Sequence, residues 1–126
     1  VMLNSRDPGK VEAVLDWEMS TVGDPLVDLG LILCYWSQPS DPGGAKPSLT
    51  SQPGWFTPAE IVEYYGTHTG RDVSRIAYYE VFAIFKLAVV LQQIYYRFFN
   101  GQTQDERFRH FDQRVRNLIA QAEAKI

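Results

Sequence analysis

The sequence predicts an α+β fold that is mostly α-helical, with a small β-hairpin at its N-terminus. Residues 1–15 read as two short strands joined by a turn, whereas the apolar residues after position 25 recur at helical spacing. Proline, glycine and N-cap signals separate the helical stretches. Hydrophobic residues make up 45% and charged residues 21% of the 126 positions, which are values of a globular domain.

The predicted strands are residues 2–4 and 11–15, and the segment between them contains the turn-forming tripeptide Asp7-Pro8-Gly9. The second strand leads into Asp16, so this carboxylate is expected at the carboxyl end of a strand. Glu18 follows two residues later and would project from the same side if the backbone stayed extended.

A helix from position 25 to about 36 is predicted to follow the hairpin. Asp24 is a favoured N-cap residue, and Pro25 suits the first helical position. Capping alone is sufficient to explain Asp24. Asp28 lies one turn later among apolar residues, where a carboxylate usually needs a fixed partner. The alternative for Asp28 is an exposed helix carboxylate.

The next segment, residues 37–55, contains four prolines and is predicted to be a surface loop, a candidate lid over a substrate site. Thr57-Pro58-Ala59-Glu60 is a capping box that should open a helix to about residue 69. The longest predicted helix spans residues 74–99 and ends at Asn100-Gly101. It is apolar enough to resemble a membrane span, but charged and amide side chains along it argue against one.

Four polar residues of this helix fall within about 40° of one another at 100° per residue. We call them the polar stripe: Tyr79, Lys86, Gln93 and Arg97. The stripe either faces water or lines a cleft for the acceptor substrate, in which Lys86 or Arg97 would bind an anionic group. A terminal amphipathic helix is predicted over residues 105–125.

Composition narrows the class of protein further. The net charge is −3 and the pI about 5.3, and the arginines of residues 105–116 alternate with acidic residues, so no nucleic-acid partner is expected. The single cysteine, Cys34, cannot form an internal disulfide and should be a small core residue. No signal peptide pattern is visible, so the expected compartment is the cytoplasm or an organelle matrix.

The segment Leu15-Asp16-Trp17-Glu18, followed by Gly23-Asp24-Pro25-Leu26-Val27-Asp28-Leu29, resembles the aminoglycoside phosphotransferase and choline kinase-like family, which has a protein-kinase-like fold. The sequence of this segment is most similar to one branch of the family, whose members occur as stand-alone phosphotransferases and fused to acyl-CoA dehydrogenase domains. Later runs, residues 79–88 and 97–101, are similar to the same branch.

The resemblance implies that residues 1–126 form the C-terminal, helical lobe of a phosphotransferase that uses ATP and Mg²⁺. Asp16 would be a metal ligand, and Glu18 would orient metal-bound water or a second ion. Asp28 would brace the catalytic loop, with Asp24 capping its helix. Without the resemblance, Asp16 would simply cap a turn and Glu18 would be solvated.

Family members also carry a His-Gly-Asp-x-x-x-x-Asn catalytic loop, just before the strand that corresponds to Val1–Leu3, and an upstream lobe that holds the nucleotide. Neither the loop nor the lobe is found in these 126 residues. The catalytic base is therefore expected upstream of Val1, with no catalytic residue in residues 1–126. The chain alone is expected to be inactive.

The expected function of the intact protein is phosphorylation of a hydroxyl on a small molecule, and the resemblance suggests a hydroxyacyl-CoA-like metabolite as acceptor. Two alternatives remain: a non-catalytic, pseudokinase-like or helical interaction module, and a lipid- or CoA-binding helical domain. The presence of Asp16 favours the kinase, because a degenerate kinase has little reason to keep a metal carboxylate. The expected partners are a nucleotide and a small-molecule acceptor, without a membrane, and the sequence does not indicate an oligomeric state.

Overall fold

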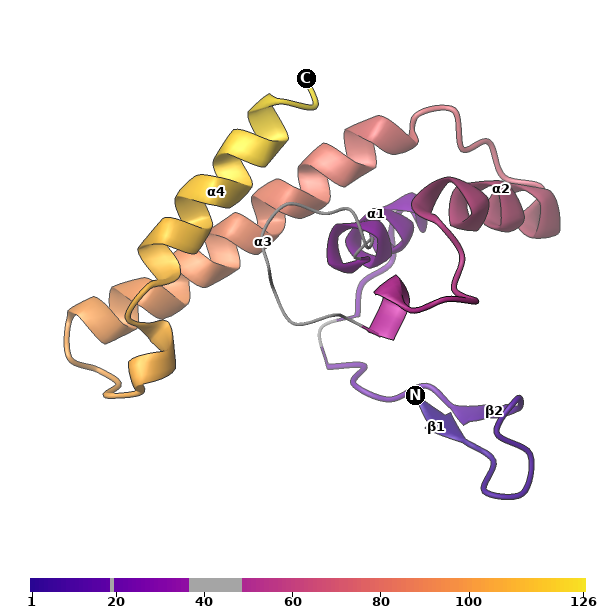
Figure 1. The fold of residues 1–126 in the computed structure, drawn as a ribbon, viewed down its shortest axis with the longest axis horizontal. Coiled ribbons are helices and arrows are strands. Elements are labelled where there is room, and N and C mark those ends of the chain that lie inside the picture. The colour runs from indigo at the N-terminus through magenta and orange to yellow at the C-terminus, as the bar shows by residue number, and fades with distance from the viewer. Residues whose placement is uncertain (19, 37–48) are drawn as a thin grey trace.

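The computed structural model describes residues 1–18, 20–36 and 49–126. Its described part confirms a mainly helical chain with a small antiparallel sheet (Figure 1). The elements in chain order are β1 (Met2–Leu3), β2 (Val11–Ala13), α1 (Leu26–Tyr35), η1 (Leu49–Ser51), α2 (Pro58–Thr69), α3 (Ile76–Phe99), η2 (Glu106–Phe108) and α4 (Phe111–Glu123). Most of the predicted proline-rich loop, residues 37–48, lies outside the described residues.

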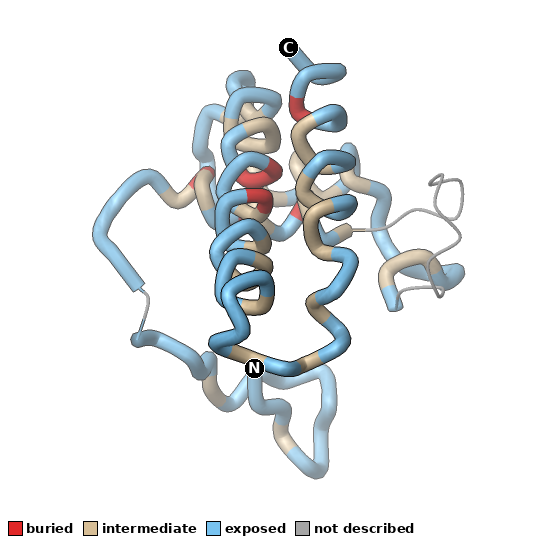
Figure 2. The backbone as a smooth tube through the Cα atoms, turned by 90° about the vertical axis from the view of Figure 1, so that its left-hand side faces the viewer, coloured by how far each residue is buried: buried red, intermediate tan, exposed pale blue. Residues whose placement is uncertain are grey.

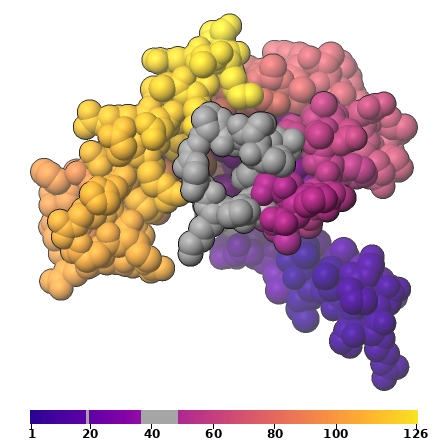
Figure 3. Space-filling model, in the orientation of Figure 1, coloured from indigo at the N-terminus to yellow at the C-terminus, as the bar shows by residue number. Residues whose placement is uncertain are grey.

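The N-terminal hairpin is held by its turn. The side chain of Asn4 accepts hydrogen bonds from the backbone N–H groups of Arg6 and Asp7, at 2.8 and 2.9 Å. The Lys10 N–H donates to the carbonyl of Asp7 at 3.0 Å. The hairpin projects away from the helices (Figure 3).

Both strands of the hairpin are shorter than expected. The first strand begins at Met2, as predicted, and ends at Leu3, one residue earlier than predicted. Met2 pairs with Ala13, the last residue of β2, and the ladder does not continue past this pair to Val1. For the same reason β2 ends at Ala13, two residues earlier than predicted.

The core forms where α1 is packed between its neighbours. Leu26, Leu29 and Leu33 of α1 are buried, and side chains of α2 and α3 pack against them. α3 packs against α1 on one side and against α4 on another (Figure 1). Figure 2 shows that the buried positions lie on the helices, while the hairpin is mostly exposed.

One close helix crossing fixes α1 on α3. A Cβ atom added at Gly30 would lie 2.5 Å from the backbone oxygen of Tyr79 and 2.8 Å from its carbonyl carbon. These distances are far below van der Waals contact, so only glycine allows the two backbones to approach this closely.

Several large apolar side chains of α3 are exposed among the described residues. They include Phe82, Phe85, Val89, Val90, Tyr96 and Phe99. By length and composition α3 is able to cross a membrane, but the core helices of soluble proteins pass the same test. The prediction that it does not cross one therefore stays a prediction.

The capping box of α2 is confirmed. The Glu60 N–H donates to Thr57 Oγ1 at 3.2 Å, and the Thr57 N–H donates to the Glu60 carboxylate at 2.7 Å. At the other end, Gly70 adopts the left-handed conformation with φ 67°, which terminates the helix.

Replacing Thr57 by Ala is expected to lower the free energy of unfolding by about 1 kcal/mol, because the Glu60 N–H loses its acceptor. Thr67 lies on the same helix without a capping role, so Thr67→Ala is the matched control. Denaturant unfolding of both variants measures the difference, and equal stabilities would show that the box contributes nothing.

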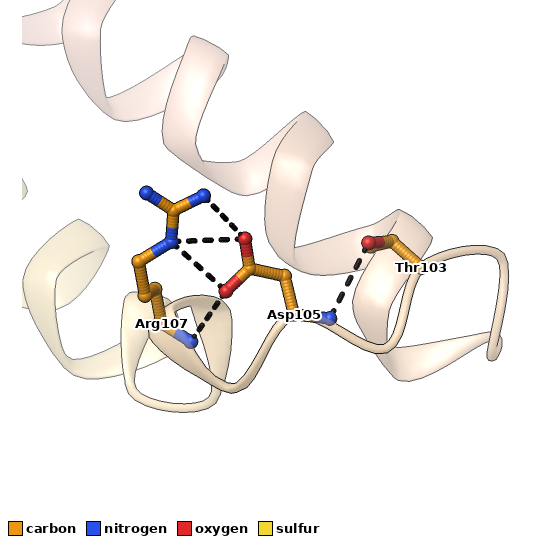
Figure 4. Close-up of polar contacts among 3 residues, drawn as sticks. All are labelled: Thr103, Asp105 and Arg107. Atoms are coloured by element: carbon orange, nitrogen blue, oxygen red, sulfur yellow. Dashed lines mark hydrogen bonds and ion pairs between the residues drawn. The ribbon is translucent and has the colours of Figure 1, made fainter.

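The terminal helix begins later than predicted, at Phe111 rather than Asp105. Asp105 instead caps the separate turn η2: its carboxylate accepts from the Arg107 backbone N–H at 3.0 Å and binds the Arg107 guanidinium (Figure 4). This strong local contact favours the short turn over a continued α-helix.

Candidate functional site

Asp16 lies in the segment that joins the hairpin to α1, three residues beyond the end of β2. It has φ 75°, and among the described residues it is the one non-glycine residue in the left-handed region. This conformation costs free energy for most residues, and such strain concentrates at functional sites. Local bonds support it: the Trp17 indole donates to the Val14 carbonyl at 2.6 Å, and the Ser20 N–H donates to the Trp17 carbonyl at 2.9 Å.

Strand alternation does not determine the side to which Glu18 projects. Alternation requires an extended backbone, and the left-handed conformation of Asp16 interrupts it. The expectation that the two side chains share one side therefore loses its physical basis. Glu18 is exposed, as is Asp16.

Val1 stands next to the position from which the catalytic base is expected. Its side chain is exposed and carries no titratable group. Because Met2 pairs with Ala13, the start of β1 lies beside the end of β2, three residues before Asp16. A catalytic base upstream of Val1 stays a prediction.

We call residues 16–24 the acidic segment. Its carboxylates are suited to a magnesium site that is completed by phosphate oxygens and water. Among the described residues, neither Asp16 nor Glu18 has an ion pair, and no three histidine, cysteine or acidic side chains gather to hold a metal. Mg²⁺ is commonly bound by one or two carboxylates together with phosphate oxygens and water, and not by an all-protein cage. Two exposed carboxylates without ion pairs fit that role, and their assignment as metal ligands stays a prediction.

Asp24 joins the start of α1 to α3. One carboxylate oxygen accepts from the Leu26 N–H at 2.9 Å, and the other accepts from the Tyr79 hydroxyl at 2.5 Å. The helix itself is assigned from Leu26, one residue later than predicted, but the side chain of Asp24 performs the capping. The Tyr79 hydroxyl, with smaller contributions from the Leu26 N–H and the nearby Arg71 and Arg75, lowers the pKa of Asp24.

This lowered pKa predicts a pH-dependent contribution to stability. Because the folded-state pKa of Asp24 lies below its ordinary value of 3.8, the contribution is fully present above that pH and is lost as the pH falls through the lowered value. Tyr79→Phe should therefore lower the melting temperature more at pH 7 than at an acidic pH at which Asp24 is protonated in the folded protein. Tyr78→Phe removes a neighbouring exposed hydroxyl and is the control. A loss for Tyr79→Phe that is the same at both pH values would contradict the assignment.

Asp28 is exposed on α1, and no hydrogen bond or ion pair to another described residue holds its carboxylate. It thus presents a carboxylate to solvent one turn after the cap of the helix. Its predicted role, bracing a catalytic loop, stays a prediction.

The polar stripe is divided between two places. Gln93 and Arg97 line a surface hollow of about 500 Å³ near the C-terminal end of α3, together with Gln92, Tyr96 and Gln102. Lys86 is exposed and outside this hollow, and Tyr79 lies at the crossing with α1. The prediction that all four line one acceptor cleft is therefore reduced to the pair Gln93 and Arg97. That Gln93 and Arg97 bind the substrate stays a prediction.

A second cavity, of about 460 Å³, lies between α1, α3 and α4. It is lined by the half-buried Cys34, whose thiol pKa is raised by burial and by the neighbouring Glu80. Lys125 Nζ lies 2.5 Å from the Glu80 carboxylate at its wall and ties the end of the chain to α3. Cys34 is thus at the edge of the core, not deep within it.

Two structural features of the site were not predicted from the sequence: the Tyr79–Asp24 hydrogen bond and the tight approach at Gly30. Gly30 carried a usable signal, because a glycine inside an apolar helix commonly marks a close packing contact. Tyr79 carried none, since its partner lies 55 residues away.

Comparisons with known proteins agree with this region. Residues 1–61 match the model of the phosphotransferase enzyme family. Acyl-CoA dehydrogenase family member 10 of Mus musculus is 33% identical over 100 residues, which are 76% of this chain and 9% of that protein. Member 11 of Mus musculus is 30% identical over 101 residues, which are 77% of this chain and 13% of that protein.

The chain thus spans about a tenth of the length of these curated relatives. No solved structure matches it. The family match includes Asp16, Glu18, Asp24 and Asp28, and ends before the polar stripe. The resemblance inferred from the acidic segment is confirmed: residues 1–61 match the phosphotransferase enzyme family.

Proposed function

We propose that the protein containing these residues transfers the γ-phosphoryl group of ATP, with Mg²⁺, to a hydroxyl of a small molecule. The observation that carries the proposal is the segment from Asp16 to Asp28. It lies within the range that matches the family, and its Asp16 is exposed, has no ion pair among the described residues and adopts a strained backbone conformation.

The chemistry explains why exposed carboxylates suit this reaction. Phosphoryl transfer depends mainly on positioning and on neutralising charge at the phosphate oxygens. Asp16 would hold Mg²⁺, and Glu18 would orient metal-bound water or a second ion. When bound, Mg²⁺ supplies the positive charge that bridges the phosphates. The protein's own contribution here is to hold these carboxylates in place.

We further propose that residues 1–126 are the helical lobe of a larger phosphotransferase domain. Large apolar side chains of α3 and of the hairpin are exposed in the described chain. Apolar surface that a domain leaves exposed often contacts another part of a protein. The catalytic base would then be supplied by residues upstream of Val1.

The acceptor we propose is a hydroxylated acyl-CoA or a similar anionic metabolite. Two observations support it: the relatives are named as acyl-CoA dehydrogenase family members, and Arg97 lies beside Gln93 in a surface hollow. A guanidinium favours phosphate and carboxylate groups and disfavours a polycationic acceptor such as an aminoglycoside.

Transfer of labelled phosphate by the full-length protein tests both the phosphotransferase function and the proposed acceptor. With Mg·ATP, we expect labelling of hydroxyacyl-CoA and none of the matched acyl-CoA whose acyl chain lacks the hydroxyl. Labelling of an aminoglycoside instead would contradict the acceptor but not the phosphotransferase. A folded protein that labels no hydroxylated compound and releases no ADP would contradict the function itself.

Replacing Arg97 by Ala should raise the acceptor KM roughly tenfold, because a charge-assisted contact to the anionic group is lost. Arg116, an exposed arginine on α4, provides the control variant Arg116→Ala. If Arg97→Ala retains the parent KM, the hollow is only a hydrated helix surface.

A further inference from the structure

Tyr79 contacts α1 in two ways. Its hydroxyl donates to the carboxylate of Asp24 at 2.5 Å. Its backbone carbonyl lies directly beneath Gly30, where an added Cβ would be 2.5 Å away. One residue of α3 therefore holds both the first turn of α1 and the point at which the two helices cross.

Asp24, which accepts the hydrogen bond from Tyr79, is the last residue of the acidic segment. Five residues separate it from Glu18. On the other side of that segment is the hairpin, which projects away from the helices (Figure 1). The hydrogen bonds of Trp17 and Ser20 stay within the segment, so Asp24 is where the segment becomes tied to the helical core.

The Tyr79 hydroxyl is also oriented by its surroundings. The ring of Tyr79 packs edge-on against Tyr78, with centroids 5.2 Å apart, and the Arg75 guanidinium lies 5.8 Å from the centre of the Tyr78 ring. Tyr79 itself is half-buried and packs against the leucine cluster of α1. Because the ring is held, its hydroxyl meets Asp24 without a large loss of side-chain freedom on binding.

We propose that Tyr79 is a positioning residue for phosphoryl transfer: its hydroxyl fixes Asp24 and thereby the helical end of the segment that carries Asp16 and Glu18. The inference rests on the proposed function. It assigns Tyr79 a role away from the acceptor, in holding metal-binding carboxylates. Groups that orient metal ligands without touching the metal commonly change metal affinity 10- to 100-fold.

The test is the Mg²⁺ dependence of phosphate transfer by the full-length protein. Tyr79→Phe keeps the ring and removes only the hydroxyl. We expect the Mg²⁺ concentration for half-maximal rate to rise roughly tenfold. Tyr78→Phe, which removes the adjacent hydroxyl, should leave it unchanged. Asp24→Asn keeps one oxygen that can accept from the Leu26 N–H, and its amide N–H can donate to the Tyr79 hydroxyl oxygen, so it should shift the Mg²⁺ dependence less than Asp24→Ala.

A lower melting temperature for Tyr79→Phe with the parent's Mg²⁺ dependence would overturn the proposal, because that result describes a purely structural hydrogen bond. An equal shift for Tyr79→Phe and Tyr78→Phe would overturn it as well. If the unsubstituted protein transfers no phosphate, the proposed function has failed. The thermal coupling between Tyr79→Phe and Asp24→Ala then still shows whether the hydrogen bond forms.

Discussion

Replacing Asp16 by Asn in the full-length protein should reduce phosphoryl transfer by about a hundredfold or more, comparable to losing one preorganised electrostatic group from an active site. The substitution removes a negative charge from the metal ligand while keeping the size of the side chain. Asn also tolerates the left-handed φ of 75° at this position, so the backbone should persist.

The fold should survive because Asp16 is exposed and has no ion pair among the described residues. An unchanged melting temperature would confirm that the loss is chemical. Asp7→Asn is the matched control, since Asp7 is an aspartate of the hairpin turn outside the acidic segment and Asn forms the same kind of turn. Near-normal turnover of Asp16→Asn at ordinary Mg²⁺ concentrations would refute Asp16 as a metal ligand.

Replacing Gly30 by Ala should lower the free energy of unfolding by about 1–3 kcal/mol or more, the usual cost of inserting a methyl group into a packed contact. The new Cβ would meet the backbone oxygen of Tyr79 at 2.5 Å. Backbone cannot rotate aside as a side chain does, so α1 and α3 would have to separate. The better helix propensity of Ala returns only about 1 kcal/mol.

Gly23→Ala is the matched control, because a Cβ at Gly23 would have no atom within 4 Å. Denaturant unfolding of the two variants compares the same change of residue with and without a neighbouring backbone. If Gly30→Ala is as stable as Gly23→Ala, the close crossing of α1 and α3 is not present in the protein.

The elements that were predicted correctly depend on local chemistry. The capping box at Thr57 and Glu60, the end of its helix near residue 69 and the turn of the hairpin are each decided within a few residues. Such signals are readable because both partners lie in one short stretch of sequence.

The failure at the polar stripe originates in contacts between distant residues. Helical periodicity correctly grouped the polar stripe on one side of α3, but it carries no information about where another helix crosses. α1 crosses at Tyr79, so this end of the stripe is bound to Asp24, whereas Gln93 and Arg97 line a hollow further along. The late start of α4 has the opposite cause, a local Asp105–Arg107 contact that competes with the helix.

The most direct test of a metal site at the acidic segment is iron-mediated cleavage of the full-length protein. Fe²⁺ replaces Mg²⁺ at oxygen sites, and with ascorbate and peroxide it cuts the backbone close to where it is bound. In the presence of ATP, we expect cleavage between residues 14 and 23, suppressed by excess Mg²⁺ and lost in Asp16→Asn. Cleavage that is confined to other segments, or that is as strong in Asp16→Asn as in the parent, would contradict the metal site and the phosphotransferase mechanism built on it.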